Sequence, residues 1–318
     1  MKKRRSKKIY IEGTINEENQ RLLDKYERHM NVKELSETTI RNYMYELESW
    51  MRFLGDQNVL DVDSDDIEEY IFFMKKEGNN INRIRFKFST LSAFFKYLKK
   101  KKMVKENPVE DVDRPKKSEK IVEQTYLTLG QVNELKEKLH EQDNLQIEVF
   151  INLGLVTMAR KNALGNIMWK NIDWENNMIT GIIEKEGYVV DLFIDDYTKE
   201  LLHELRKQRR REDIRNPYVF ITRYNNKWNK ATNTTLSNWV KFAGQLIGIP
   251  ELHAHDLRHT TNNLLKEAGM PLEDIAELLH HQSTDTTLKH YIQKDPTKLQ
   301  QQLNSFNPFN NTKKNKKK

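Results

Sequence analysis

The sequence predicts a mainly α-helical protein with a small β-hairpin, an α+β fold in two domains. Its 318 residues exceed the usual length of one domain, and only 11 of them are Gly and 7 are Pro. Long segments repeat apolar residues at spacings of three and four, the pattern of amphipathic helices, and two short apolar runs around a Gly-containing turn indicate a hairpin. A polar segment without periodicity divides the helical pattern and marks the domain boundary.

The domain boundaries follow from these changes in pattern. In chain order we expect a basic N-terminal tail at 1–15, a helical domain at 16–112, a linker at 113–124, a second domain at 125–306 and a basic disordered tail at 307–318. Asn107-Pro108 stops the helical pattern of the first domain, because Pro cannot continue a helix.

The first domain is predicted to consist of four or five amphipathic helices. One spans 16–30, and the next begins where Ser36 or Thr38 can cap its first turn. Asp63 is expected to cap a third helix in the same way. A fourth, over 81–102, combines an apolar side with many Lys and Arg residues on the rest of its surface.

The second domain is predicted to place its hairpin between groups of helices. Helices are expected near 128–142 and 145–156. The strands of the hairpin are expected at 178–183 and 188–194, and an apolar run follows at 218–221. The remainder is expected to be helical.

Positive charge is concentrated at the chain ends and in one internal segment. Of the net charge of +7, residues 1–10 carry +6 and residues 313–318 carry +5, so the body between them has 7 − 11 = −4. Residues 81–120 hold 13 Lys/Arg against five Asp/Glu, a local charge of +8. Nucleic acid is therefore the expected partner. The expected phosphate contacts are Arg83, Arg85, Lys87, Lys99, Lys100, Lys101 and Lys102.

Several classes of protein are excluded by composition. With no Cys, the chain has no disulfide and no cysteine-ligated zinc. No apolar run approaches the length of a membrane span, and the basic N-terminus is not followed by the apolar stretch of a secretory signal. We therefore expect a protein of the cytoplasm or nucleoid with no membrane partner.

The densest group of reactive side chains is the run His253-Ala-His-Asp-Leu-Arg-His259, which opens a predicted helix. On that helix His255 and Arg258 can point into one volume near the N-terminus, where an anion is favoured. Arg160 at the start of another helix and Tyr291 near the C-terminus are further candidates. Such a group could bind either phosphate or zinc.

Phosphate is the preferred interpretation of this group. His255 and His259 have the i, i+4 spacing of zinc ligands, but the Glu of an H-E-x-x-H site is replaced by Asp256. Arg258 between the two imidazoles also disfavours a metal cation. We therefore expect no metal and, in the absence of a G-x-x-x-x-G-K loop, no nucleotide cofactor.

From about residue 16 to residue 295 the chain resembles the tyrosine recombinase, or phage integrase, family. The segment from Met158-Ala-Arg160 to Ile172-Asp173 is similar to the family pattern G-[LM]-R-x-S-E-L-x-x-L-x-W-x-D-I-D. His255 to His259 matches the H-x-L-R-H box, and Leu278-Leu-His-His281 resembles L-L-G-H. Lys185 in Glu184-Lys-Glu-Gly187 matches the family's hairpin lysine and makes a fourth box. Four separated boxes in the family's order make the resemblance specific, whereas one alone would be weak.

The resemblance implies a role for each candidate residue. Arg160 and Arg258 would hold the scissile phosphate, and Tyr291 would be the nucleophile that forms a 3′-phosphotyrosyl intermediate. His255 would be the general base, Lys185 on the hairpin the general acid, and His281 a hydrogen-bond donor to the phosphate. The resemblance also implies a core-binding first domain and a catalytic second domain.

The resemblance further implies an assembly. The implied partner is double-stranded DNA. A homotetramer on synapsed DNA is expected, with a monomer free in solution, accessory directionality proteins, and 296–306 as a helix exchanged between neighbours. The two-domain layout without a separate arm-binding domain is that of the Xer-like members.

Three departures from the family pattern define the alternatives. Ala163 replaces the acidic residue that commonly orients the first arginine, so support for Arg160 is expected from elsewhere. His280 replaces Gly, and Tyr291 lies ten residues after His281 where nine is commoner. These departures favour, as one alternative, a DNA-binding protein of the same fold without catalysis. A metal-dependent nuclease that uses the histidines is another. The target DNA and the outcome of recombination are not encoded in these motifs.

Overall fold

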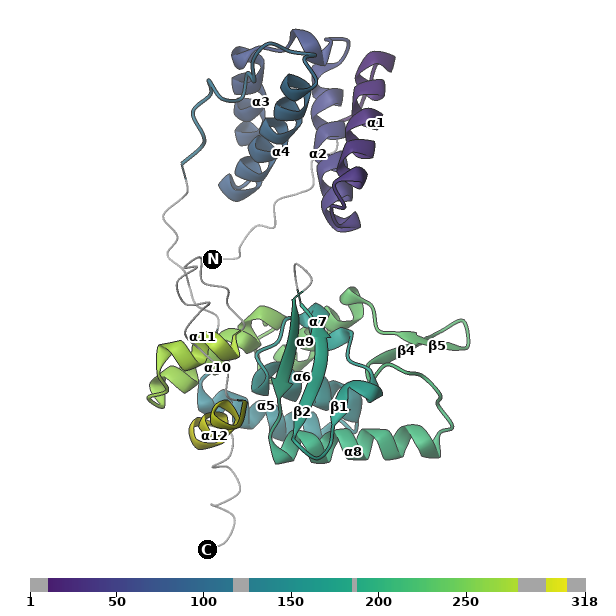
Figure 1. Ribbon diagram of the computed structural model, residues 1–318, viewed down its shortest axis with the longest axis vertical. Coiled ribbons are helices and arrows are strands. Elements are labelled where there is room, and N and C mark those ends of the chain that lie inside the picture. The colour runs from purple at the N-terminus through teal and green to yellow at the C-terminus, as the bar shows by residue number, and fades with distance from the viewer. Residues whose placement is uncertain (1–10, 117–125, 185–187, 280–295, 308–318) are drawn as a thin grey trace, which may run out of the picture. The chain divides into compact units, whose positions relative to one another are not determined.

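The computed structural model describes residues 11–116, 126–184, 188–279 and 296–307 (Figure 1). The chain divides into two compact units, residues 1–122 and 123–318. The described parts are mostly helical with small antiparallel sheets, which confirms the predicted fold class. None of the described helices is long and apolar enough to cross a membrane.

The first unit is built from helices that begin at side-chain caps. Its α-helices are α1 (Glu17–Val32), α2 (Glu37–Leu54), α3 (Ser64–Lys76) and α4 (Ile81–Lys100), with the 3-10 turn η1 (Val59–Asp61) between α2 and α3. The side chains of Asn16, Ser36, Asp63 and Asn80 each accept a backbone N–H from the first turn of the helix that follows. The caps predicted at Ser36 and Asp63 are confirmed.

Aromatic side chains fill the core of this unit. Trp50 of α2 and Phe94 and Phe95 of α4 are fully buried, and the rings of Trp50 and Phe95 meet edge to face with centroids 5.6 Å apart. Edge-to-face contacts of this kind add to the free energy gained from burial alone. They fix α4 against α2.

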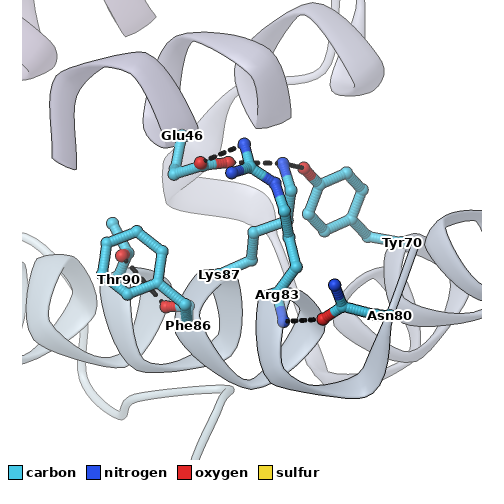
Figure 2. Close-up of polar contacts among 7 residues, drawn as sticks. All are labelled: Glu46, Tyr70, Asn80, Arg83, Phe86, Lys87 and Thr90. Atoms are coloured by element: carbon cyan, nitrogen blue, oxygen red, sulfur yellow. Dashed lines mark hydrogen bonds and ion pairs between the residues drawn. The ribbon is translucent and has the colours of Figure 1, made fainter. Parts of the chain in front are cut away.

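A buried ion-pair network also joins these helices (Figure 2). The Glu46 side chain of α2 is only 4% exposed, and its two oxygens lie 2.5 Å from Arg83 Nη2 and 2.6 Å from Lys87 Nζ, both on α4. Lys87 Nζ also donates to the Tyr70 hydroxyl of α3, at 3.0 Å. Three helices therefore meet at one carboxylate.

The second unit surrounds a buried helix. Its α-helices are α5 (Leu129–Glu141), α6 (Leu145–Val156), α7 (Lys161–Gly165), α8 (Asp196–Arg211), α9 (Asn233–Leu246), α10 (Ala254–Glu267), α11 (Leu272–Leu278) and α12 (Pro296–Phe306), with the 3-10 turn η2 (Trp169–Asn171). From Ile147 onward every residue of α6 is buried, and α5, α8, α9 and α10 pack around it. Helix α6 therefore sets the position of the elements that follow it.

Two antiparallel sheets complete the unit. β1 (Ile172–Asp173), β2 (Met178–Ile183) and β3 (Val189–Phe193) form one sheet in the order β1-β2-β3, with a register shift between Ile179 and Ile182 where Gly181 has φ +69°. β4 (Ile221–Tyr224) and β5 (Lys227–Lys230) form the other. The predicted hairpin is confirmed, with β3 one residue shorter at each end.

The β4–β5 hairpin was not expected from the sequence. Only Ile221 of the apolar run at 218–221 belongs to β4, and Trp228 is the one apolar residue of β5, so this strand has no repeated alternation of apolar and polar residues. The turn is made by Asn225 and Asn226, which both have positive φ. Consecutive Asn residues favour such a turn and were the available signal.

We predict that Glu46→Gln lowers the free energy of unfolding by about 3–5 kcal/mol, the usual cost of removing one partner of a buried ion pair. The substitution leaves the Lys87 ammonium buried without a counter-charge. Glu48→Gln is the matched control on the same helix, because Glu48 and its partner Arg52 are 37% and 23% exposed. Its cost should stay under about 1 kcal/mol. Equal urea midpoints for the two variants would contradict the role assigned to Glu46.

Candidate active site

Arg160 lies where the chain leaves α6 and enters α7, as the N-cap residue of α7. Its backbone N–H donates to Glu184 Oε1 at 3.2 Å, and its guanidinium pairs with the other carboxylate oxygen of Glu184. The Arg160 side chain is 39% exposed, whereas that of Glu184 is 2% exposed. One face of the guanidinium is therefore anchored while another remains open to solvent.

Met158 turns the chain toward this position. It has φ +52°, a conformation that non-Gly residues seldom adopt, and it stands where the family pattern has Gly. Its side chain is 1% exposed and packs in an apolar cluster with Leu265, Leu278 and Leu279. Burial of the side chain offsets the backbone cost at a position where Gly would have none.

Arg258 of α10 is held by backbone carbonyls. Its residue is 3% exposed, Nη1 donates to the Met158 carbonyl at 2.6 Å, and Nη2 donates to the Leu279 carbonyl. Burial, followed by the positive charge of Arg160, lowers the pKa of Arg258 to about 10, so the group stays charged near neutral pH. Carbonyl acceptors orient the fork without neutralising it, which leaves its charge available to an anion.

His255 lies one turn before Arg258 and is exposed. Desolvation where its imidazole contacts the protein lowers the pKa of that group below the ordinary 6.5, and the positive charges of His259, Arg258 and Arg160 act in the same direction. The rings of His255 and His259 are 4.3 Å apart between centroids. A neutral imidazole next to two guanidinium groups can accept a proton near neutral pH.

Helix α10 is fixed by hydrogen bonds from both of its threonines near the site. Thr261 Oγ1 donates to the Leu155 carbonyl of α6 at 2.6 Å, and Thr260 Oγ1 accepts from the Leu127 backbone N–H at 2.9 Å. At the N-terminus, Asp256 accepts from the His253 backbone N–H at 2.8 Å. These bonds set the rotation of α10 that turns His255 and Arg258 toward Arg160.

The structure therefore brings together three of the residues predicted from the sequence, Arg160, His255 and Arg258. The two arginines can donate hydrogen bonds to the nonbridging oxygens of a phosphodiester from two sides, and the imidazole can receive a proton from an attacking hydroxyl. Lys185, His281 and Tyr291 lie outside the described residues, as does His280. Within the described residues, no group of three His, Asp or Glu side chains is placed to hold a metal ion.

The predicted DNA-contact residues of α4 fall into two groups. Arg83 and Lys87 pair with Glu46 inside the unit, and Arg85 donates to the Pro115 carbonyl. The other four, Lys99, Lys100, Lys101 and Lys102, are exposed at the C-terminal end of the helix and just beyond it.

Lys87 differs most from the expected cationic surface, because it is 5% exposed and its charge is already balanced. The position of Lys87 in the sequence indicated its burial, although the local excess of Lys and Arg did not. Ile84, Lys87 and Leu91 follow the spacing of three and four that defines the apolar side of α4. A cation on that side must be buried, and a buried cation needs a partner.

Glu184 is the site residue that sequence reasoning did not name. The signal for it was indirect, since Ala163 left Arg160 without the usual acid and Glu184 directly precedes the candidate Lys185. Only the fold shows that the end of β2 reaches the start of α7 (Figure 1).

Comparisons with known proteins identify the family and the fold. A model of the phage integrase family matches residues 125–298, and a model of the SAM-like N-terminal domain of phage integrases matches residues 22–105. Tyrosine recombinase XerC of Pediococcus pentosaceus is 27% identical over 307 residues, which are 90% of this chain and 98% of XerC.

Solved structures of lambda integrase show the same fold. A dimer bound to a COC′ core site has a TM-score of 0.66 at 20% identity, with 87% of this chain and 98% of that chain covered. A tetramer bound to a Holliday junction has a TM-score of 0.67 at 18% identity, with 87% and 80% covered. With a family model matched over more than half of its length, the chain belongs to the phage integrase family, the tyrosine recombinases that break and rejoin DNA strands.

Proposed function

We propose that this chain carries out site-specific recombination with Arg160, Arg258 and His255 around the scissile phosphate, Tyr291 as nucleophile, Lys185 as general acid and His281 as a further donor. The observation that carries the proposal is the pair of anchored guanidinium groups: Glu184 pairs with Arg160, and Arg258, one turn after His255 on α10, donates to the Met158 carbonyl two residues before Arg160. The two guanidinium groups offer fixed hydrogen-bond donors to the nonbridging oxygens of the phosphate, where negative charge develops in the transition state.

The proposed cleavage step conserves the phosphodiester. The Tyr291 hydroxyl attacks phosphorus while His255 accepts its proton, and the bond from phosphorus to the 5′ oxygen breaks as Lys185 gives that oxygen a proton. A 3′-phosphotyrosyl link remains. Attack by a free 5′ hydroxyl on that link reverses the step and rejoins a strand, so neither ATP nor a metal is required.

We further propose duplex DNA as the substrate and a homotetramer as the active assembly. Lambda integrase, which shares the fold, is described in complex with a core site and as a tetramer on a Holliday junction. The exposed lysines at 99–102 supply the positive charge that a phosphate backbone requires. A monomer free in solution and accessory directionality proteins remain part of this proposal, as does action in the cytoplasm, where such DNA lies.

Tyr291→Phe should abolish the covalent adduct and leave DNA affinity unchanged, because only the attacking oxygen is removed. The measurement is formation of a protein–DNA band, stable to denaturation, on a nicked suicide duplex that carries the site selected by the protein from a random library. EDTA should leave the wild-type band intact. Wild-type binding without any adduct would favour the inactive DNA-binding alternative, and strict dependence on a divalent ion would favour the nuclease.

The rate of adduct formation should fall on acidification with a midpoint below pH 6.5, because His255 must be neutral to accept a proton and its pKa is lowered. His255→Asn should remove this dependence and slow cleavage by about 10²–10⁴-fold. His253→Asn, which keeps a capping residue at the N-terminus of α10, is the control and should retain the profile of the wild type. A midpoint above pH 6.5 assigned to His255 would be inconsistent with its surroundings.

Charge reversal at Lys100 and Lys101 should weaken duplex binding and reduce the slope of log affinity against log salt concentration by about 2, since each lost phosphate contact contributes roughly 0.9. Reversal at Lys75 and Lys76, an exposed pair at the end of α3, is the matched control. If both pairs change the slope equally, the end of α4 is not a distinct contact surface.

A further inference from the structure

Arg160 lacks an acidic partner on its own helix. The family pattern has Glu three residues after this arginine, and here that position is Ala163, which is 2% exposed in the core of the unit. A methyl group can neither accept a hydrogen bond nor balance a charge. Something else must determine which way the guanidinium turns, because an exposed Arg side chain otherwise samples many rotamers.

Glu184 makes the contacts that Ala163 cannot make. One carboxylate oxygen accepts the Arg160 backbone N–H at 3.2 Å, and the other pairs with Nη1 of the guanidinium. A carboxylate that grips both the backbone and the side-chain end of one residue leaves that side chain little freedom. The Glu184 side chain is 2% exposed, and a buried carboxylate is stable only when it is paired, so the contact persists.

The origin of this carboxylate distinguishes it from an acid on α7. Glu184 directly follows β2, and its backbone N–H donates to the Tyr188 carbonyl at 2.8 Å, which closes the β2–β3 hairpin. Lys185 is the next residue in the chain. The peptide that holds Arg160 is thus covalently joined to the residue proposed to protonate the leaving oxygen.

We propose that Glu184 is the positioning residue of Arg160, that it takes over from the acid missing at position 163, and that it ties the arginine to the hairpin segment bearing Lys185. The inference rests on the proposed function, since it concerns how one catalytic group is oriented. In this chain Glu184, which orients the arginine of the phosphate clamp, directly precedes the proposed general acid Lys185.

The test combines Glu184 and Arg160 substitutions in a double-mutant cycle, measured as the single-turnover rate of adduct formation on the nicked suicide duplex. Glu184→Ala should slow cleavage by about 100-fold, the scale of a misplaced catalytic group, while duplex affinity stays within threefold. Glu184→Ala added to Arg160→Ala should cost less than about threefold more, because a residue that acts through Arg160 has nothing left to position. Glu175→Ala, at an exposed acid in the β1–β2 turn, is the control and should match the wild type.

A second readout asks for rescue. Ala163→Glu, introduced with Glu184→Ala, places the acid where the family pattern has it and should restore at least tenfold of the lost rate. Glu184→Gln keeps the shape of the side chain and should fall between Glu184→Ala and wild type, which covers the case in which the alanine variant unfolds. Thermal unfolding of every variant accompanies the rates.

The outcomes distinguish the positioning role of Glu184 from the proposed cleavage of DNA by Tyr291. No adduct with the wild type would overturn the proposed function. An active wild type with Glu184→Ala and Glu184→Gln at the same rate as wild type would overturn the positioning role alone. So would a full 100-fold loss from Glu184→Ala in the Arg160→Ala background, since that loss would come from the fold of the hairpin and not from Arg160.

Discussion

The guanidinium group of Arg160 lies close enough to that of Arg258 to disfavour the charge of Arg258, and the second unit holds both groups in place. The proximity is visible in the pKa of Arg258, which burial and Arg160 both lower. Like charges in a partly dry site repel strongly because the dielectric screening of water is reduced. The repulsion is tolerated because each group is restrained by different acceptors, carbonyl oxygens for Arg258 and a carboxylate for Arg160. An anion that binds between them relieves it.

The restraints come from segments far apart in the chain. Met158 and Leu279, which supply the carbonyls, lie just after α6 and α11, and Glu184, which supplies the carboxylate, lies just after β2. None of these segments is long, and each is positioned by packing against the buried helix α6 or the apolar cluster around Leu265 and Met270. The site is therefore as rigid as the core beneath it, a condition for preorganised electrostatic stabilisation.

Local sequence patterns were sufficient to predict a helix or strand where the signal lies within that element itself. The bounds of α6 and β2 coincide with the predicted ranges, since a run of apolar residues and a strand with a Gly-containing turn are local signals. They failed where the environment comes from another element. Nothing near Lys87 in the sequence shows that Glu46 lies across from it, and the single apolar residue of β5, Trp228, is 38% exposed. Motif spacing named Arg160, His255 and Arg258, whereas Glu184 required the pairing of β2 with β3 and the approach of both to α7.

Helix α12 packs against the apolar cluster that contains Leu279, where its Leu303 is 2% exposed. The Gln300 side chain of the same helix donates to the Ile194 carbonyl at 3.3 Å. Tyr291 precedes the first residue of α12 by five positions, so covalent geometry keeps its Cα within about 18 Å of that residue. The short connection to α12 therefore limits how far the Tyr291 phenol can lie from that helix. Because the chain is continuous, a displacement of α12 from this cluster would also displace the region of space that the Tyr291 phenol can reach.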